Sequence, residues 1–231
     1  MIDYGMDVWI DVLSTYRMAW ISGRVGVGKT SIAYKTAEYY LKKGYKLITN
    51  NKCVWADENI KMNENGTLRA VVLIDEGGLY LKVNRQVELM ASYPAKMDVV
   101  YLIPSYWPPA RAAQQVRLHG MFTLRKAGLP WNVYKWTAGT GAFRDSGIVI
   151  CDTRSVFGIY DRQDPSAGAD EIIKNMMEYI EEFLKYHGRE NIESDEYDTP
   201  EYYLQDAASA IAEAGDEISS SVVRLRKKRK Y

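Results

Sequence analysis

The residues best suited to chemistry lie in a glycine-rich octapeptide at positions 23–30, Gly-Arg-Val-Gly-Val-Gly-Lys-Thr. It fits the pattern G-x-x-x-x-G-K-[ST], in which consecutive backbone N–H groups surround a phosphate chain at the start of a helix. Lys29 is expected to reach the β- and γ-phosphates, and Thr30 to place its hydroxyl on Mg²⁺. The pattern therefore predicts a site for ATP and Mg²⁺. The predicted nucleotide-binding residues are Gly23, Gly26, Val27, Gly28, Lys29, Thr30 and Ser31.

Two adjacent carboxylates, Asp75 and Glu76, end a continuous apolar run that begins at Leu68. Such a run is typical of a central parallel strand, and a carboxylate at the carboxyl end of that strand can hold Mg²⁺ beside Thr30. The acid that follows is placed to orient and deprotonate an attacking water. The alternative is a pair of acids that caps a strand at the surface. The glycine loop upstream favours the catalytic interpretation.

Phosphoryl transfer also requires a cation for the charge that builds on the γ-phosphate, often supplied by a neighbouring subunit. Arg85, Arg111 and Arg117 are candidates, although each could be an ordinary surface arginine. Ser105 follows the next predicted strand and could sense the γ-phosphate or simply form a turn. The predicted catalytic residues are Lys29, Asp75, Glu76, Arg85 and Ser105, and the predicted metal ligands are Thr30 and Asp75.

Hydrophobic periodicity predicts the elements that position these residues. Residues 16–22 form a short apolar strand, and a helix with one buried face follows the loop. Further strands are predicted over 45–50, 68–76 and 98–103, with a helix over 84–93. Strands that alternate with helices predict an α/β fold with a mainly parallel central sheet flanked by helices. Together with the glycine loop, this fold is expected to be a P-loop NTPase. The buried stripe of the first helix is expected to contain Ile32, Ala33, Thr36, Ala37, Tyr40 and Leu41.

The pattern changes beyond residue 109. Short apolar segments alternate with glycine-rich turns there, which favours antiparallel strands at the C-terminal side of the sheet. An apolar segment over residues 6–13 has no assigned type. The elements predicted beyond residue 109 are a helix over 110–118, strands over 121–124, 133–137 and 147–151, a helix over 169–186 and a thinner helix over about 199–219.

The composition indicates a folded protein rather than a disordered one. The 231 residues are 47% hydrophobic, and no uninterrupted apolar stretch is long enough to cross a membrane. Acids replace the basic residues of a signal peptide near the N-terminus, so secretion is not expected. Cys53 and Cys151 form no disulfide framework or zinc spacing, and a reducing cytoplasm is the expected location.

Charge divides the chain into an expected ATPase domain at residues 1–187 and an extension at residues 188–231. The total charge is zero, but residues 188–217 contain ten acids and one base, and residues 224–231 contain six bases and no acid. The basic tail could bind nucleic-acid phosphates, fold back onto the acidic stretch, or only improve solubility. The extension is expected to be partly helical or disordered.

Several segments resemble the FtsK–HerA superfamily of P-loop ATPases, and within it the viral branch of genome-packaging ATPases and Zot-like assembly ATPases. Residues 43–50, Lys-Gly-Tyr-Lys-Leu-Ile-Thr-Asn, are similar to the second strand of Zot-like proteins. Residues 71–78 resemble their acid-bearing strand, which places the catalytic glutamate at Glu76. Residues 156–161 are similar to a short element near the end of the domain in that group.

The resemblance implies an ATP-hydrolysing motor that translocates DNA, assembled as a ring of five or six subunits. A viral capsid or portal-like vertex would be a further partner, and the location would be the host cytoplasm or the virion. Zot-like proteins commonly carry a membrane segment, and its absence favours a genome-packaging ATPase over a virion assembly or export ATPase. A nucleotide-binding switch is the alternative from another class, and a small-molecule kinase would use the same loop.

Overall fold

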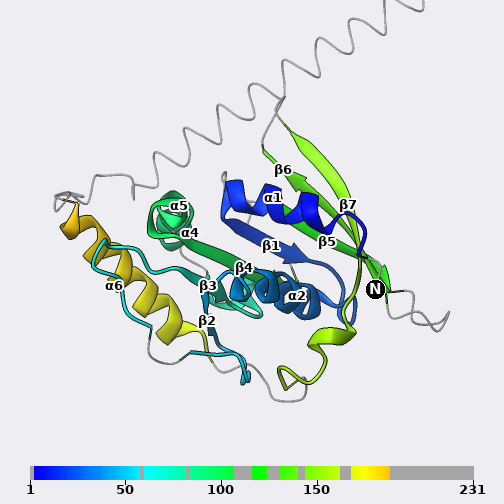
Figure 1. The fold of residues 1–231 in the computed structure, drawn as a ribbon. Coiled ribbons are helices and arrows are strands. Elements are labelled where there is room, and N and C mark those ends of the chain that lie inside the picture. The colour runs from blue at the N-terminus through cyan, green and yellow to red at the C-terminus, as the bar shows by residue number, and fades with distance from the viewer. Residues whose placement is uncertain are drawn as a thin grey trace, which may run out of the picture. The chain divides into compact units, whose positions relative to one another are not determined.

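The computed structural model describes residues 3–57, 60–81, 84–106, 116–123, 131–139, 144–161 and 168–187. Within this part of the chain, seven strands form one sheet in the order β2-β3-β4-β1-β5-β6-β7, with helices on its faces (Figure 1). The extension at 188–231 lies outside the described residues. The elements are α1 Met6–Tyr16, β1 Met18–Ser22, α2 Lys29–Leu41, β2 Lys46–Thr49, β3 Ala70–Leu73, α3 Gly77–Tyr80, α4 Asn84–Ser92, α5 Pro94–Met97, β4 Val99–Ser105, β5 Val116–Thr123, β6 Trp131–Ala138, β7 Asp145–Asp152, the 3₁₀ helix η3 Arg154–Val156 and α6 Asp170–Tyr186.

Strands β2, β3, β4, β1 and β5 are mutually parallel, as the alternation of strands and helices predicts. Every residue of β1, β3 and β4 is buried, which explains why these strands have apolar runs rather than an alternating pattern. Strand β4 lies between β1 and β3, so one strand separates the glycine loop from the two acids. The expected α/β fold with a mainly parallel sheet is confirmed.

Strands β6 and β7 complete the sheet in antiparallel pairs with β5, which confirms the expected change of pattern. The helix predicted over 110–118 is wrong at its end, because residues 116–118 belong to β5. Val116 and Leu118 are buried, whereas Arg117 between them is partly exposed, so the segment has the period of two that a strand requires. Residues 107–115 lie outside the described part.

Two apolar cores cover the two faces of the sheet. One core joins α1 and α2 to residues from β1 to β7, including Trp9, Ile32 and Tyr134. The other joins α4, α5 and α6 to β1, β3 and β4, and no described residue of β5, β6 or β7 belongs to it. The helix expected over 169–186 is confirmed as α6, and the unassigned segment at 6–13 is helical as part of α1.

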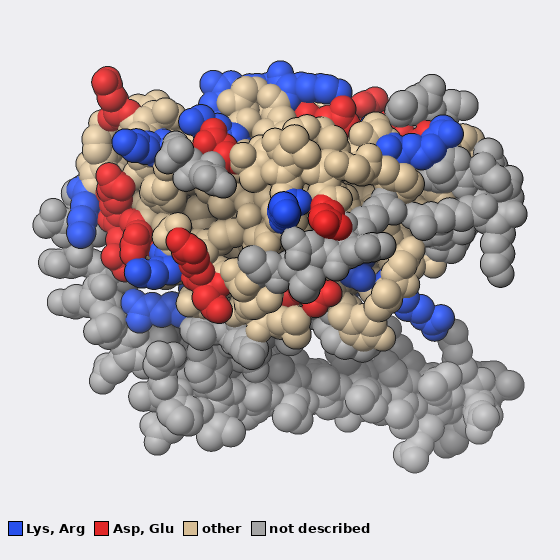
Figure 2. Space-filling view, turned by 90° about the horizontal axis from the view of Figure 1, so that it is seen from below, with Lys and Arg blue, Asp and Glu red and all other residues tan. Residues whose placement is uncertain are grey.

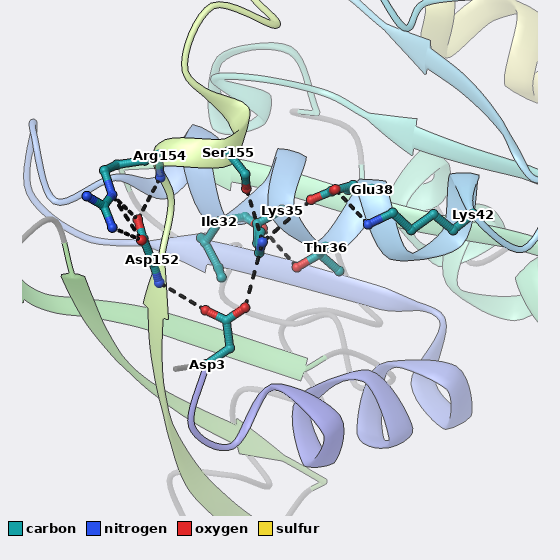
Figure 3. Close-up of polar contacts among 9 residues, drawn as sticks. All are labelled: Asp3, Ile32, Lys35, Thr36, Glu38, Lys42, Asp152, Arg154 and Ser155. Atoms are coloured by element: carbon teal, nitrogen blue, oxygen red, sulfur yellow. Dashed lines mark hydrogen bonds and ion pairs between the residues drawn. The ribbon is translucent and has the colours of Figure 1, made fainter. Parts of the chain in front are cut away.

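A polar network fastens the outer side of α2 to the N-terminal segment and the end of β7 (Figure 3). Lys35 Nζ lies 3.7 Å from Asp3 Oδ2 and 3.0 Å from Ser155 Oγ. Asp3 Oδ1 accepts a hydrogen bond from the backbone N–H of Asp152 at 3.1 Å, and the Asp152 carboxylate binds the Arg154 guanidinium. The network holds α2 in place without using its N-terminal end. Among the described helices, none is long and apolar enough to cross a membrane.

Candidate nucleotide-binding site

The glycine loop connects β1 to α2 at the carboxyl edge of the parallel strands. Its glycines have positive φ angles, 145° at Gly23, 82° at Gly26 and 87° at Gly28, a region that favours glycine. A Cβ atom on Gly28 would lie 2.5 Å from Asn132 Nδ2 and 2.8 Å from Tyr134 Oη. The loop therefore requires glycine at position 28 for two reasons, the backbone angle and the close packing against β6.

Strands β5 and β6 contact the glycine loop through Tyr134 and Gly120. The Tyr134 hydroxyl donates to the carbonyl oxygens of Gly28 at 2.7 Å and Val27 at 3.2 Å. A Cβ atom on Gly120 of β5 would lie 2.5 Å from Val27 Cγ2, so the loop rests directly on that strand. The Gly28 carbonyl also accepts from the N–H of Ile32 at 3.0 Å, so the hydroxyl of Tyr134 fixes the point where the loop becomes helix α2.

Lys29 spans the loop. Its ammonium group donates to the carbonyl oxygens of Gly23 at 3.1 Å and Arg24 at 3.2 Å. Burial lowers the pKa of Lys29 from its ordinary value, and the nearby charges of Asp75 and Glu76 act in the opposite direction. The lysine is held at the loop by weak neutral acceptors, which phosphate oxygens can replace with stronger charge-assisted bonds.

The glycine loop and the acidic strand meet at Thr30 and Asp75. Thr30 Oγ1 donates to Asp75 Oδ1 at 3.1 Å and lies 3.2 Å from Oδ2. Asn51 Nδ2 donates to Asp75 Oδ2 at 3.1 Å, and the N–H of Glu76 donates to Oδ1 at 3.1 Å. Residues far apart in the sequence thus converge on one carboxylate.

Asn50 holds the backbone of Asp75 from the neighbouring strand end. Its side-chain oxygen accepts from the Asp75 N–H at 2.8 Å, and its amide nitrogen donates to the Asp75 carbonyl oxygen at 3.2 Å. Asn50 and Asn51 are both buried and follow β2, which pairs with β3 in parallel register. Sequence reasoning assigned neither residue to the site, although their place after a strand next to the acidic strand is the signal that could have done so.

The Asp75 carboxylate is held by neutral hydrogen-bond donors, and Lys29 lies near enough to interact with its charge without forming an ion pair. Burial raises the pKa of Asp75 above its ordinary value, while the hydrogen bonds from Asn51 and Thr30 oppose that shift. No ion pair joins Asp75 to a lysine or arginine in the part of the chain that the structure describes. A bound cation would relieve this unbalanced charge.

The donor set fits Mg²⁺. A hydroxyl oxygen and a carboxylate are hard oxygen ligands, and Mg²⁺ is usually held by one or two protein groups together with water and phosphate oxygens. No group of three or more histidine, cysteine or acidic residues gathers among the described residues. Thr30 and Asp75 are the residues that would hold the ion.

Glu76 is exposed and occupies an unusual backbone conformation. Its φ angle is 54°, and α3 begins directly after it. Positive φ in a residue other than glycine costs on the order of 1–3 kcal/mol and is concentrated at functional sites. The following Gly77 permits the turn, because a Cβ atom there would lie 2.2 Å from Ile103 Cγ2.

The remaining predicted residues have different positions in the fold. Ser105 is buried at the end of β4 and is in register with Ser22, the residue before the loop. Arg85 is exposed on α4, and no hydrogen bond or ion pair joins it to another described residue. Arg117 lies within β5 in register with Trp20, and Arg111 falls outside the described residues.

Ser31 links the site to a peripheral aromatic cluster. Its hydroxyl lies 3.0 Å from the Tyr160 hydroxyl, so its backbone N–H is the group left to face a phosphate. Tyr160 stacks on Tyr34 of α2 with ring centroids 4.4 Å apart.

A surface cavity of about 690 Å³ adjoins this cluster, lined in part by Lys52, Cys53 and Tyr160. Figure 2 shows acidic and basic side chains interspersed over the face that it presents.

Comparison with known proteins supports the nucleotide chemistry. A family described as "Novel STAND NTPase 3" matches residues 3–77, a range that contains the glycine loop, Asp75 and Glu76. No curated protein matches the chain. The match indicates an NTPase, and it covers the segment in which Thr30 meets Asp75.

Proposed function

We propose that this chain is a Mg²⁺-dependent ATPase that translocates DNA, and that it packages a viral genome. The observation that carries the proposal is the 3.1 Å hydrogen bond between Thr30 and Asp75, which brings the glycine loop and the acidic strand to one point. The family match over residues 3–77 supports nucleotide hydrolysis. The resemblance of three segments to FtsK–HerA motors supports the DNA substrate and the viral role.

Each residue of the site has a definite role in this proposal. Loop N–H groups and Lys29 bind the β- and γ-phosphates, and Lys29 exchanges its carbonyl partners for phosphate oxygens. Mg²⁺ held by Thr30 and Asp75 would neutralise charge on the same phosphates. Asn50 and Asn51 orient Asp75, and Glu76 takes a proton from the attacking water.

In a ring, a neighbouring subunit would supply a second cation, in addition to Lys29, for the γ-phosphate. Arg85 is exposed on α4 without a described partner, so it is available to the γ-phosphate of a neighbouring subunit. Ser105 would sense that phosphate from the end of β4. A ring of five or six subunits would act in the host cytoplasm and dock on a capsid or portal-like vertex.

The experiment that tests the proposal measures ATP hydrolysis by the purified full chain with and without nucleic acid. Duplex DNA, single-stranded DNA and RNA are added separately at matched nucleotide concentration. We expect duplex DNA to increase the hydrolysis rate. Glu76→Gln is the matched control, because it keeps the side-chain shape and should still bind ATP and Mg²⁺ while losing turnover.

Three outcomes would overturn the proposal in different ways. Stimulation by single-stranded DNA alone would favour a virion assembly or export ATPase. Hydrolysis at full rate by a monomer, with no response to any polymer, would favour a nucleotide-binding switch. Equal rates for the wild type and Glu76→Gln would remove Glu76 from the mechanism.

A further inference from the structure

The antiparallel half of the sheet has one face that no described helix covers, since no described residue of β5, β6 or β7 joins the core beneath α4, α5 and α6. Successive cross-strand positions on this face are Arg117, Thr137 and Ser146 in one row, and His119, Lys135 and Ile148 in the next. The side chains between them in the strands point to the opposite face and belong to the core beneath α1 and α2. We call these six positions the outer face.

The outer face is open and basic. Lys135, His119, Ser146 and Ile148 are exposed, and Arg117 and Thr137 are partly exposed. None of these six positions is an aspartate or glutamate, and neither Arg117 nor Lys135 forms an ion pair with a residue that the structure describes. A folded surface with unpaired cations and hydroxyl groups is suited to an anionic polymer.

The outer face is also connected to the glycine loop. His119 Nδ1 lies 3.0 Å from Ser22 Oγ, and Ser22 is the last residue before the loop. The next residue of β5, Gly120, lies so close to the loop that a Cβ atom on it would meet Val27 Cγ2 at 2.5 Å. A displacement of His119 would therefore reach the start of the loop through Ser22 and its interior through Gly120 and Val27.

We propose that the outer face binds the phosphate backbone of DNA and that β5 transmits this contact to the glycine loop. The inference rests on the proposed function, since it names the surface that the DNA substrate would contact. Arg117 and Lys135 are diagonal neighbours, about 7–8 Å apart at their backbones, so their long side chains can bind separate phosphates. This assignment places Arg117 at the polymer rather than at a neighbouring active site.

Charge and composition favour DNA over two other occupants. A second copy of the chain would place like charges opposite each other in a two-fold contact, which is unfavourable. A membrane surface would require a broad exposed apolar area. Ile148 is the one exposed aliphatic side chain among the six positions, and in the next row of this face Val133 is buried and Ile150 is only partly exposed. Hydroxyl groups at Thr137 and Ser146 are typical donors to phosphate oxygens.

The test measures the affinity of the full chain for a fluorescent DNA duplex as a function of salt concentration, without ATP. The variants are Lys135→Glu and the double variant Arg117→Glu/Lys135→Glu. Each lost phosphate contact should reduce the slope of log affinity against log salt by about 0.9. We therefore expect reductions of about 0.9 and about 1.8, together with weaker binding. Lys135→Glu should keep its basal ATPase activity and lose stimulation by DNA.

A matched control reverses charge elsewhere. Lys61→Glu and Lys185→Glu alter two exposed lysines that do not lie on the outer face, and they should leave the salt slope unchanged. Equal slopes for the wild type and the outer-face variants, with DNA stimulation intact, would overturn the inference and leave the proposed function standing. A wild type that binds no DNA and shows no stimulation would overturn both. Altered subunit assembly without altered DNA binding would assign the face to a protein contact instead.

Discussion

Two carboxylates beside helix α2 have opposite surroundings. Asp152 is 1% exposed and is bound by the Arg154 guanidinium through contacts of 3.0 and 2.6 Å, which hold the pKa of Asp152 below its ordinary value. Asp75 receives hydrogen bonds only from neutral groups, and burial raises its pKa. Asp152 has a guanidinium partner among the described residues, whereas no described lysine or arginine forms an ion pair with Asp75, the proposed ligand of Mg²⁺.

The difference is the one expected between a structural carboxylate and the proposed metal-binding carboxylate. A charge paired inside the fold contributes to stability, and removing one partner leaves the other uncompensated. A charge held by dipoles alone reduces stability until a ligand arrives, so binding and folding have opposing demands at that position. The network in Figure 3 holds the outer side of α2. Thr30, in the first turn of the same helix, donates to the Asp75 carboxylate.

The largest expected effect comes from replacing the Asp75 carboxylate by its amide. Asp75→Asn should reduce ATP hydrolysis by roughly 100- to 1,000-fold, the scale of losing one strong electrostatic group from an active site. Its thermal midpoint should stay equal or rise, because burial makes the ionised carboxylate less favourable in the folded protein than in the unfolded chain, and the amide removes that cost. Measurements of hydrolysis and thermal unfolding on the same preparations check both expectations.

Asp152→Asn is the matched comparison and should behave in the reverse manner. It removes the partner of Arg154 and should lower the thermal midpoint, while hydrolysis per folded molecule is retained. If Asp152→Asn abolished hydrolysis in a folded protein, or if Asp75→Asn had no effect on it, the distinction between the two carboxylates would be wrong.

A smaller effect is expected from Asn51→Ala. The side chain of Asn51 orients the Asp75 carboxylate, and groups of this kind typically change metal affinity by about 10- to 100-fold. We expect the Mg²⁺ concentration for half-maximal hydrolysis to rise by that factor, with a smaller change in the maximal rate. An activity titration with Mg²⁺ at saturating ATP measures it. Unchanged Mg²⁺ dependence would show that Asn51 has no part in metal binding.

Tyr134→Phe should have a more modest effect on the loop. The change removes the hydroxyl that donates to Gly28 and Val27, at a cost of about 1 kcal/mol for a partly buried hydrogen bond. The loop should become less ordered, so we expect the KM for ATP to rise by a few-fold while Asp75 and Glu76 still function. Steady-state kinetics separate the two parameters, and a lower kcat at unchanged KM would contradict a role confined to the loop.

The parts of the fold that the sequence predicts correctly depend on local patterns. The strands before the loop and before Asp75 have long apolar runs, and α6 has a strong helical period. The end of the helix expected over 110–118 fails because β5 is placed by its pairing with β1, a non-local contact that a short window does not contain.

The residues of the candidate site also divide into those that a local motif predicts and those that only the strand order brings together. Thr30 and Asp75 are predicted because each follows from a motif, and the structure places them in contact. Tyr134 and His119 lie in no motif, and the motif that ends at Asn50 assigns that residue no role at the site. Their contacts depend on which strands become neighbours. The strand order places β2 beside β3 and β5 beside β1. Asn50 therefore contacts Asp75, and His119 contacts Ser22 before the loop.

The smallest expected effect concerns the pH dependence of the stability that the ion pair between Asp152 and Arg154 contributes. Arg154→Ala should lower the thermal midpoint at neutral pH, because the ionised Asp152 then loses the guanidinium that stabilises it. The Asp152 pKa is lower in the folded protein than in the unfolded chain. The contribution of the pair is therefore fully present above the ordinary carboxyl pKa, about 3.9, and is lost as pH falls through the folded value.

The difference in midpoint between the wild type and Arg154→Ala should accordingly be constant from pH 7 to about pH 5 and shrink below about pH 4. Thermal unfolding at several pH values measures this difference. Lys61→Ala is the control and should show none, because Lys61 is exposed and forms no ion pair with a described residue. A difference that persisted unchanged at acidic pH would mean that Arg154 stabilises the end of β7 through packing rather than through the charge of Asp152. The contrast with Asp75 would then depend on the active-site carboxylate alone.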